Sequence, residues 1–208
     1  MQTEKVIDYI VNWLKDYATK AGVKGYVIGV SGGVDSGVVS TLCAMTGLKV
    51  LALEMPIRQQ KDQASRALEH IDFLKNKFPN VEGFTVDLNE PFEALYKTFD
   101  VKDDEFPAEK LAFANTRSRL RMLTLYYYGQ INGLLVCGTG NKVEDFGIGF
   151  YTKYGDGGVD VSPIADLYKT EVYALARALD LPESIKNAIP TDGLWDVDRT
   201  DEQQIGAT

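Results

Sequence analysis

One stretch near the N-terminus, residues 26–36, constrains the fold more than any other part of the chain. It reads YVIGVSGGVDS and begins with a short apolar run, Tyr26 to Val30, that is typical of a buried strand. Gly32 and Gly33 then allow a tight turn, and a helix is predicted from Val34 to about residue 46. Because a helix that begins after such a turn presents unpaired N–H groups, the stretch predicts a phosphate-binding unit.

Asp35 distinguishes this turn from the common phosphate loop of nucleotide hydrolases. No Gly-Lys-Ser/Thr triplet follows the turn, so it is not a Walker A loop. A bare carboxylate would repel phosphate, whereas a carboxylate that holds Mg²⁺ would help to bind it. Ser31 and Ser36 add hydroxyl donors to the same turn. The alternative is a purely structural turn in which Asp35 favours the positive end of the helix dipole.

Predicted strands and helices alternate along the chain. Strands are expected over 26–30, 49–55, 81–88 and 134–139, and helices over 3–18, 34–46, 59–77, 90–99, 107–130 and 169–181. This alternation predicts an α/β fold with a parallel sheet and helices on both faces. Ligands of such sheets bind beyond the carboxyl ends of the strands, where the turn at Ser31 is expected to lie.

Length and composition limit the classes of protein to consider. A chain of 208 residues predicts one domain, and a net charge of −8 argues against a broad nucleic-acid surface. No apolar run is long enough to span a membrane, and residues 1–5 lack the pattern of a signal peptide. We therefore expect a cytoplasmic location. Cys43 and Cys137 lie in apolar stretches and are expected to be small buried side chains.

The helix over 3–18 is amphipathic, and its role is open. Its apolar face is predicted to contain Val6, Ile10, Trp13, Leu14 and Tyr17. Such a face either covers the sheet or contributes to a dimer.

The long helix expected before residue 130 carries four polar residues at helical spacing. Asn115 and Arg119 share one face, and Arg117 and Arg121 share another. The sequence leaves open whether these side chains bind a ligand or form a solvated basic surface.

Residues 140–158 contain six glycines among several charged residues. A charged, pliable segment of this kind after a strand end is typical of a lid that closes over a polar ligand. A mobile surface loop is the alternative.

Four segments occur in a fixed order along the chain: SGGVDS at 31–36, NTRSRLRM at 115–122, GTGNKVE at 138–144 and FYTKYGDGGVD at 150–160. Pro190 and Thr191 follow them. Together these segments resemble the ammonia-dependent NAD synthetases of the ATP pyrophosphatase superfamily. The first segment is shared by the whole superfamily, whereas the segment that ends in GDGGVD is far more specific. The resemblance extends over about residues 1–208.

The resemblance implies a Rossmann-like fold of the adenine nucleotide alpha hydrolase type. It also implies a ligase that amidates deamido-NAD (nicotinate adenine dinucleotide) with ammonia and ATP, through an acyl-adenylate, to give NAD, AMP and pyrophosphate. Mg²⁺ is the implied cofactor, and a homodimer is the implied assembly. We expect one domain over 1–208, with a mobile lid at about 140–160 and a C-terminal extension at about 183–208.

The resemblance further implies roles for the residues at matching positions. The ATP-binding set is Gly29, Val30, Ser31, Gly32, Gly33, Val34, Asp35, Ser36, Thr139, Lys169 and Thr191. The set for deamido-NAD is Asn115, Arg119, Lys153, Asp156 and Asp160. Asp35 and Glu144 would hold Mg²⁺, and no side chain would act as a covalent nucleophile. Both substrates are polyanions, so cationic groups and a metal ion are expected to converge on them.

The chain departs from the pattern of the family in two places. Relatives usually continue beyond the position of Thr208 into a segment with a His-Lys pair, whereas the single histidine of this chain is His70. Asn141 and Lys142 stand where bacterial relatives commonly carry Asp-His, although an Asn-Lys version is also familiar in the family.

Other interpretations differ in the chemistry that they require. A GMP synthetase-like amidotransferase would share the turn but not the GDGGVD segment, and a tRNA thiolase would be expected to show catalytic cysteines and a basic RNA surface. A non-catalytic nucleotide sensor would not need the separated carboxylates of Asp35 and Glu144. A glutaminase needs a cysteine that is activated by a base, and no such pair is evident, so free ammonia is the expected nitrogen source.

Overall fold

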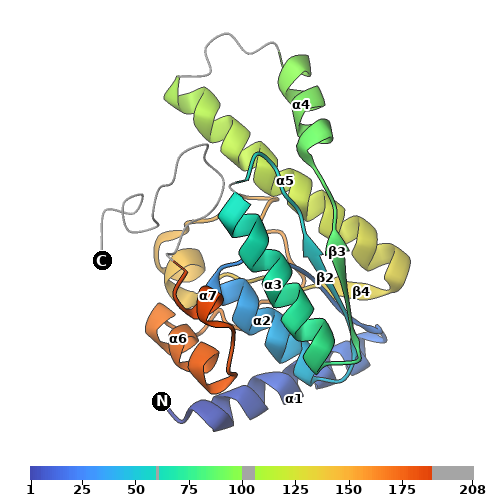
Figure 1. The fold of residues 1–208 in the computed structure, drawn as a ribbon, viewed down its shortest axis with the longest axis vertical. Helices are drawn as coiled ribbons and strands as arrows, with labels where there is room; N and C mark the ends of the chain where they lie inside the picture. Colours follow the sequence, from blue (N-terminus) through green and yellow to red (C-terminus); the bar gives the residue numbers. More distant parts are fainter. Residues whose placement is uncertain (60, 100–105, 189–208) are drawn as a thin grey trace.

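Four parallel strands form one sheet in the computed structural model, which describes residues 1–59, 61–99 and 106–188. The strands are β1 (Gly25–Gly29), β2 (Lys49–Glu54), β3 (Val81–Thr85) and β4 (Leu134–Val136), in the spatial order β3-β2-β1-β4 (Figure 1). Every neighbouring pair is parallel. The expected α/β fold is therefore confirmed.

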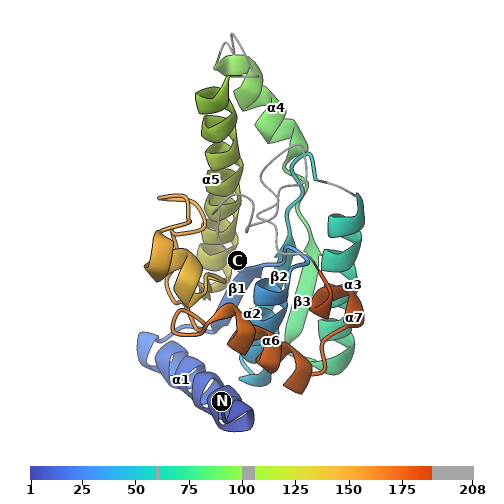
Figure 2. The same ribbon diagram turned by 90° about the vertical axis from the view of Figure 1, so that its left-hand side faces the viewer.

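Helices cover both faces of the sheet (Figures 1 and 2). One face carries α1 (Thr3–Ala21), α2 (Val34–Met45), α3 (Lys61–Lys77), α6 (Lys169–Ala178) and α7 (Glu183–Lys186), and the other carries α4 (Asn89–Thr98) and α5 (Pro107–Asn132). Because side chains on both sides of β1 are buried, Tyr26, Val27 and Ile28 have no exposed surface. This double burial explains why the first strand reads as a continuous apolar run.

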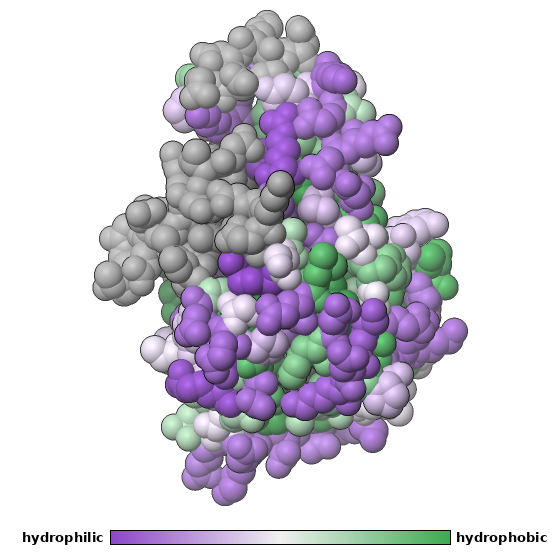
Figure 3. Space-filling view, viewed as in Figure 1, coloured by the Kyte–Doolittle hydropathy of each residue, from purple (hydrophilic) through white to green (hydrophobic). Residues whose placement is uncertain are grey.

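The outer surfaces of the helices are mostly polar. Figure 3 shows hydrophilic side chains over much of the lower half of the face that is viewed in Figure 1. Figures 1 and 2 also show that α4 and the first half of α5 extend beyond the sheet. In the described part of the chain, no helix combines the length and the apolar character that crossing a membrane requires.

The predicted apolar face of α1 is only partly buried: Ile10 and Leu14 lie in the core, whereas the two aromatic residues are partly exposed. Trp13 and Tyr17 are 36% and 41% exposed, and their ring centroids lie 5.6 Å apart. The hydroxyl group of Tyr26 in β1 donates to the carbonyl oxygen of Leu14 at 2.6 Å, which fixes the rotation of the helix against the sheet. The buried residues of α1 are Ile7, Ile10, Leu14 and Ala18.

The chain between β4 and α6 makes a long excursion from the sheet and returns to it. The N–H of Gly138 donates to the carbonyl oxygen of Val161 at 2.8 Å, and Cys137 and Val161 form a parallel bridge. Within the excursion, Lys142–Ile148 forms a π-helix that the glycine-rich sequence did not predict. The acidic connection 100–105 and residues 189–208 of the C-terminal extension lie outside the described residues.

The two cysteines and the histidine are buried between these elements. The sulfur atoms of Cys43 and Cys137 lie 3.6 Å apart as free thiols, so the expected burial is confirmed. His70 of α3 has no exposed surface, and its Nε2 lies 2.9 Å from the hydroxyl oxygen of Ser40 in α2. Ser40 in turn donates to the carbonyl oxygen of Ser36 at 2.6 Å. Burial lowers the pKa of His70 to about 4, so the imidazole is neutral at pH 7.

Replacing His70 by Gln should remove one source of acid sensitivity from the fold. The unfolded chain takes up a proton on histidine near pH 6.5, whereas the folded chain does so only near pH 4. The stability that neutral His70 contributes is therefore complete above pH 6.5 and falls by about 1.4 kcal/mol per pH unit down to about pH 4. Urea unfolding at several pH values between 7 and 5 measures the free energy of unfolding of each protein. The difference in unfolding free energy between wild type and His70→Gln should shrink with acidification, and a constant difference would contradict the assignment.

Candidate functional site

A cavity of about 250 Å³ opens at the carboxyl ends of the strands. It lies where the connections switch direction, because β1 leads through α2 to β2 on one side and has β4 as its other neighbour. Its polar lining comes from the turn after β1, the end of β2, α5 and the segment after β4. This lining includes Ser31, Asp35, Ser36, Glu54, Ser118, Arg121, Thr139, Glu144, Asp145, Asp156 and Lys169.

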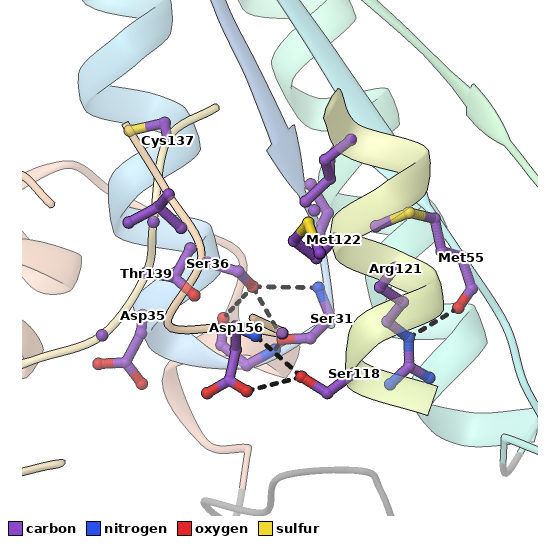
Figure 4. A pocket seen from close by; sticks show the side chains of 18 of the residues that line it. Ser31, Asp35, Ser36, Met55, Ser118, Arg121, Met122, Cys137, Thr139 and Asp156 are labelled. Carbon is purple, nitrogen blue, oxygen red and sulfur yellow. Dashed lines mark hydrogen bonds between the residues drawn. The ribbon is translucent and has the colours of Figure 1, made fainter. Parts of the chain in front are cut away.

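The turn after β1 closes on itself through two hydroxyl groups. The Ser36 hydroxyl oxygen accepts from the N–H of Ser31 at 3.2 Å and lies 3.1 Å from the Ser31 hydroxyl oxygen. Ser36 also donates to the carbonyl oxygen of Gly33 at 3.0 Å. Gly32 has φ +84°, a backbone conformation that strongly favours glycine. Figure 4 shows the two serines between Thr139 on one side and α5 on the other.

Lys169, the first residue of α6, places its ammonium group between two carboxylates. Its Nζ lies 2.6 Å from Asp35 Oδ2 and 3.0 Å from Glu144 Oε1. Burial lowers the pKa of Lys169, but attraction to Asp35 and Glu144 raises it by more, so the lysine stays protonated. Burial raises the pKa of Asp35, and Lys169 opposes that shift. Because one ammonium group reaches both carboxylates, their oxygens lie close enough together to share a cation.

Asn141 contacts the Asp35 carboxylate and the backbone of the segment that carries Glu144. Its side-chain Nδ2 donates to Asp35 Oδ1 at 3.3 Å, and its Oδ1 accepts from the N–H groups of Val143 and Glu144 at 3.1 and 3.2 Å. The second contact caps the π-helix that carries Glu144. Asn141 is 1% exposed, so its amide is fixed by these partners rather than by water.

Ser118 of α5 holds Asp156 in the cavity wall. The Ser118 hydroxyl donates to Asp156 Oδ1 at 2.6 Å and accepts from the N–H of Asp156 at 2.8 Å. The backbone of Gly155 approaches so closely that an added Cβ would lie 2.3 Å from the Ser118 hydroxyl oxygen. The pairing therefore depends on glycine at position 155.

Further contacts join α5 to the same segment. Asn115 Oδ1 accepts from the Thr152 hydroxyl at 2.7 Å, and Arg119 Nε donates to the carbonyl oxygen of Lys153 at 3.2 Å. Since these residues and Ser118 follow helical spacing, one face of α5 fixes residues 152–156.

Asp160 lies a few residues after that segment, and both of its carboxylate oxygens accept hydrogen bonds from the protein itself. Its Oδ2 accepts from the N–H of Val136 in β4 at 2.8 Å, and its Oδ1 accepts from the Tyr126 hydroxyl of α5 at 3.1 Å. In this arrangement both oxygens help to hold the returning chain against β4.

The cavity brings together most of the residues predicted to bind ATP and one of those predicted to bind deamido-NAD. From the first set and the metal pair, the lining contains Gly29, Val30, Ser31, Gly33, Val34, Asp35, Ser36, Thr139, Glu144 and Lys169; from the second it contains Asp156. Gly32, Asn115, Arg119, Lys153 and Asp160 are not part of the lining. Thr191 lies outside the described residues. The roles of all these residues stay predictions.

Arg121 is a cavity residue that was not among the predicted ligand residues. Its Nε donates to the carbonyl oxygen of Met55 at 3.0 Å, and its Nη2 donates to Gln59 Oε1 at 3.2 Å. Helical spacing had grouped it with Arg117, but the guanidinium of Arg117 is buried 5.0 Å from the centre of the Phe92 ring. Helical spacing therefore pointed to Arg121 as a candidate ligand residue, but it pointed equally to Arg117, which does not line the cavity.

Two acidic cavity residues also escaped the sequence analysis. Glu54, at the end of β2, is 4% exposed, and its carboxylate has no hydrogen bond or ion pair with another described residue. Asp145 lies in the π-helix, and burial followed by repulsion from Asp156, Glu144 and Asp35 raises its pKa to about 6. Neither residue could be found from spacing, because their surroundings come from distant parts of the chain.

Comparison with known proteins gives consistent matches. The family model described as NAD synthase matches residues 6–208. An NH₃-dependent NAD⁺ synthetase from Mesoplasma florum is 41% identical to this chain, and the alignment covers 100% of this chain and 82% of the relative.

Two solved structures share the fold over most of their length. An NMN synthetase from Francisella tularensis is 35% identical with a TM-score of 0.90, covering 100% of this chain and 83% of the other. An NH₃-dependent NAD synthetase from Campylobacter jejuni is 32% identical with a TM-score of 0.78, covering 89% and 77%.

Gly155→Ala should destabilise the protein because its Cβ would meet the Ser118 hydroxyl at 2.3 Å and the Thr152 Cβ at 2.9 Å. Forced displacement of such packed groups costs about 1–3 kcal/mol. Gly147→Ala is the matched control, since its Cβ would meet its nearest neighbour at 3.6 Å. Urea unfolding should show the loss for Gly155→Ala and a change within about 0.5 kcal/mol for Gly147→Ala. Equal effects of the two substitutions would contradict the close packing against Ser118.

Proposed function

The chain belongs to the NAD synthase family of ATP-using ligases, and we propose that it amidates deamido-NAD with ammonia to give NAD, AMP and pyrophosphate. One observation carries the proposal at the level of the site. Asp35, Glu144 and Lys169 meet beside the hydroxyl-lined turn after β1. A nucleoside triphosphate requires this combination, because its phosphates need hydrogen-bond donors, a fixed cation and ligands for a metal ion at one place.

The turn after β1 would hold the phosphates of ATP. The first N–H groups of α2 are unpaired within the helix and lie at the positive end of its dipole, which favours an anion. The hydroxyl groups of Ser31 and Ser36 lie at the same end of the helix, and Lys169 supplies a positive charge within the same cavity. The cavity thus offers backbone, hydroxyl and ammonium donors to one polyanion.

The donor atoms present fit Mg²⁺ with Asp35 and Glu144 as its protein ligands. Both are carboxylates, the hard oxygen donors that Mg²⁺ prefers, and Mg²⁺ in nucleotide sites usually has only one or two protein carboxylates. When bound, the ion would neutralise negative charge on the phosphate oxygens.

The proposed reaction has two displacement steps. The nicotinate carboxylate of deamido-NAD attacks the α-phosphorus of ATP, pyrophosphate leaves and an acyl-adenylate forms. Ammonia then attacks the acyl carbon and releases AMP. The chain contributes by holding the reactants in line and by stabilising charge on the departing groups, and no covalent nucleophile is needed. Ser31, Ser36 and Lys169 would face the pyrophosphate.

Of the residues predicted to bind deamido-NAD, Asp156 is the one that lines the cavity. Ser118 fixes its carboxylate in the cavity wall, and the contacts of Asn115 and Arg119 with residues 152 and 153 hold the same segment. We propose that deamido-NAD binds along this junction of α5 with residues 152–160. Closure of a lid formed by residues 140–160 belongs to the same proposal.

Free ammonia is the proposed nitrogen source. A glutaminase cysteine must be an accessible, activated thiolate. Cys43 and Cys137 are buried, and burial raises the pKa of Cys137 well above its usual value, with the neighbouring Cys43 adding to the shift. These properties are the opposite of those that an attacking thiolate needs.

Amidation of nicotinate mononucleotide to NMN is a second candidate function. The observation that favours it is the similarity to the Francisella tularensis structure, which is titled an NMN synthetase and covers the whole of this chain. The two reactions share the carboxylate activation and differ only in whether the acceptor carries an adenylate half.

A single assay separates these functions. The protein is incubated with Mg²⁺, ATP and ammonium, together with either deamido-NAD or nicotinate mononucleotide, and the amide product, AMP and pyrophosphate are measured. Equal yields of the three products with deamido-NAD support the first proposal, and a strong preference for the mononucleotide supports the second. Product formation from glutamine in the absence of ammonium would contradict the proposed nitrogen source, and ATP binding without pyrophosphate release would indicate a nucleotide sensor.

Asp35→Ala should lower the rate of this reaction at least about a hundredfold, the effect expected when a main electrostatic contact of the transition state is removed. Asp72→Ala is the matched control, because Asp72 lies on the exposed surface of α3 and contacts Lys75 at 3.5 Å. Near-normal turnover of Asp35→Ala would show that this carboxylate has no part in the reaction.

A homodimer is proposed from the resemblance and from one exposed surface of α5. Leu123, Tyr127 and Ile131 follow one another at intervals of four residues and are 60–63% exposed. An apolar stripe of this kind on a polar protein is typical of a contact with another chain, and a second copy is the occupant that the resemblance implies.

Ile131→Glu should weaken this dimer, because dimerisation would bury the introduced charge. In sedimentation velocity, the protein concentration at which the dimer dissociates into monomers should be at least tenfold higher for this variant than for wild type. Leu68→Glu on α3, where Leu68 is 43% exposed, is the control and should leave the dimer unchanged. A wild-type monomer at all concentrations would overturn the proposal.

A cytoplasmic location and the absence of nucleic-acid binding complete the proposal. The net charge of −8 supports the second point, since phosphate backbones attract basic surfaces.

A further inference from the structure

Lys169 occupies an unusual position for a lysine. It is the first residue of α6, where the positive end of the helix dipole disfavours a cation. Its ammonium group is nevertheless directed at Asp35 Oδ2 and Glu144 Oε1, at 2.6 and 3.0 Å. The attraction of two carboxylates thus holds the side chain in a place that its own helix does not favour.

The same two carboxylates are the proposed ligands of Mg²⁺. An ion bound to Asp35 Oδ2 at about 2.1 Å would lie about 4 Å from an ammonium group that contacts the same oxygen. Two positive charges at that separation repel strongly inside a partly buried site. The side chains concerned are only 17–25% exposed, so water screens this repulsion little.

We infer that the Lys169 ammonium group and a divalent cation exchange at the carboxylate pair of Asp35 and Glu144. The inference rests on the proposed function, in which this pair binds the metal. When the cation binds, the ammonium group leaves the carboxylates and becomes available to the phosphate oxygens of ATP. Lys169 therefore weakens metal binding in the absence of nucleotide and couples metal binding to nucleotide binding, because the phosphates are its alternative partner.

The surroundings of the cluster allow such an exchange. Asn141 holds Asp35 through Oδ1, on the oxygen that Lys169 does not contact, and it also caps the π-helix of Glu144. The start of that π-helix is joined to the start of α6 by a hydrogen bond from the N–H of Lys142 to the carbonyl oxygen of Leu167 at 3.0 Å. The Asp35 carboxylate and the backbone that carries Glu144 therefore have partners other than the lysine.

A purely structural role of Lys169 predicts the opposite result. If the ammonium group were needed to hold the two carboxylates together, its removal would let them separate and metal binding would weaken. The sign of the change in metal affinity therefore distinguishes the two roles.

The test measures Mn²⁺ binding to the full chain without nucleotide, by electron paramagnetic resonance of the free ion. Lys169→Met should bind Mn²⁺ about tenfold more tightly than wild type, as expected when one competing cation is removed. Lys142→Met is the matched control, because the ammonium group of Lys142 lies over the Tyr168 ring, 4.8 Å from its centre. The Mn²⁺ affinity of this variant should stay within about twofold of wild type. Unchanged or weaker binding by a folded Lys169→Met protein would overturn the inference.

Two further variants keep the outcome interpretable. Asp35→Asn should abolish Mn²⁺ binding; if it does not, the proposed metal site is wrong, which is a failure of the proposed function rather than of the exchange. Lys169→Ala should also bind Mn²⁺ more tightly, and added ethylammonium should weaken its binding by refilling the position of the missing ammonium group. Tight binding that ethylammonium leaves unchanged would contradict direct exchange, even if Lys169→Met cannot be obtained in a folded form.

Discussion

The site depends on one electrostatic constraint, the sharing of a single ammonium group by two carboxylates. The three charged groups come from three separate helical elements. Asp35 lies in α2, Glu144 lies in the π-helix and Lys169 is the first residue of α6. Two carboxylates directed at one place repel each other unless a cation lies between them. The contacts at 2.6 and 3.0 Å supply that cation at the point where the ends of the three elements meet.

The parallel sheet creates the place at which these elements can meet. Because β4 lies beside β1 on the side opposite to β2, the turn after β1 and the segment after β4 emerge next to each other at the carboxyl edge. α5 then forms the opposite wall, where Ser118 and Arg121 face the cavity. The excursion between β4 and α6 is held between the sheet and α5, since Asp160 contacts β4 on one side and Tyr126 on the other.

Family membership and the details of this chain answer different questions. The shared segments supply most of the polar lining of the cavity, whereas Glu54 and Asp145, which lie outside them, add two further carboxylates. The reciprocal pairing of Ser118 with Asp156 shows how one hydroxyl can determine the orientation of a predicted ligand residue.

The sequence by itself determined the order of strands and helices and the position of the glycine turn after the first strand, because these follow from local periodicity and from a contiguous motif. The roles of Asp35, Glu144 and Lys169 were implied by the resemblance and stay predictions. The sequence left open whether the apolar face of α1 covers the sheet or stays exposed, since helical spacing does not say how a helix is rotated against a sheet. It also did not predict the π-helix, the separation of Arg121 from Arg117 or the burial of Asp145. Only the tertiary structure decided these, because each depends on side chains that approach from distant parts of the chain.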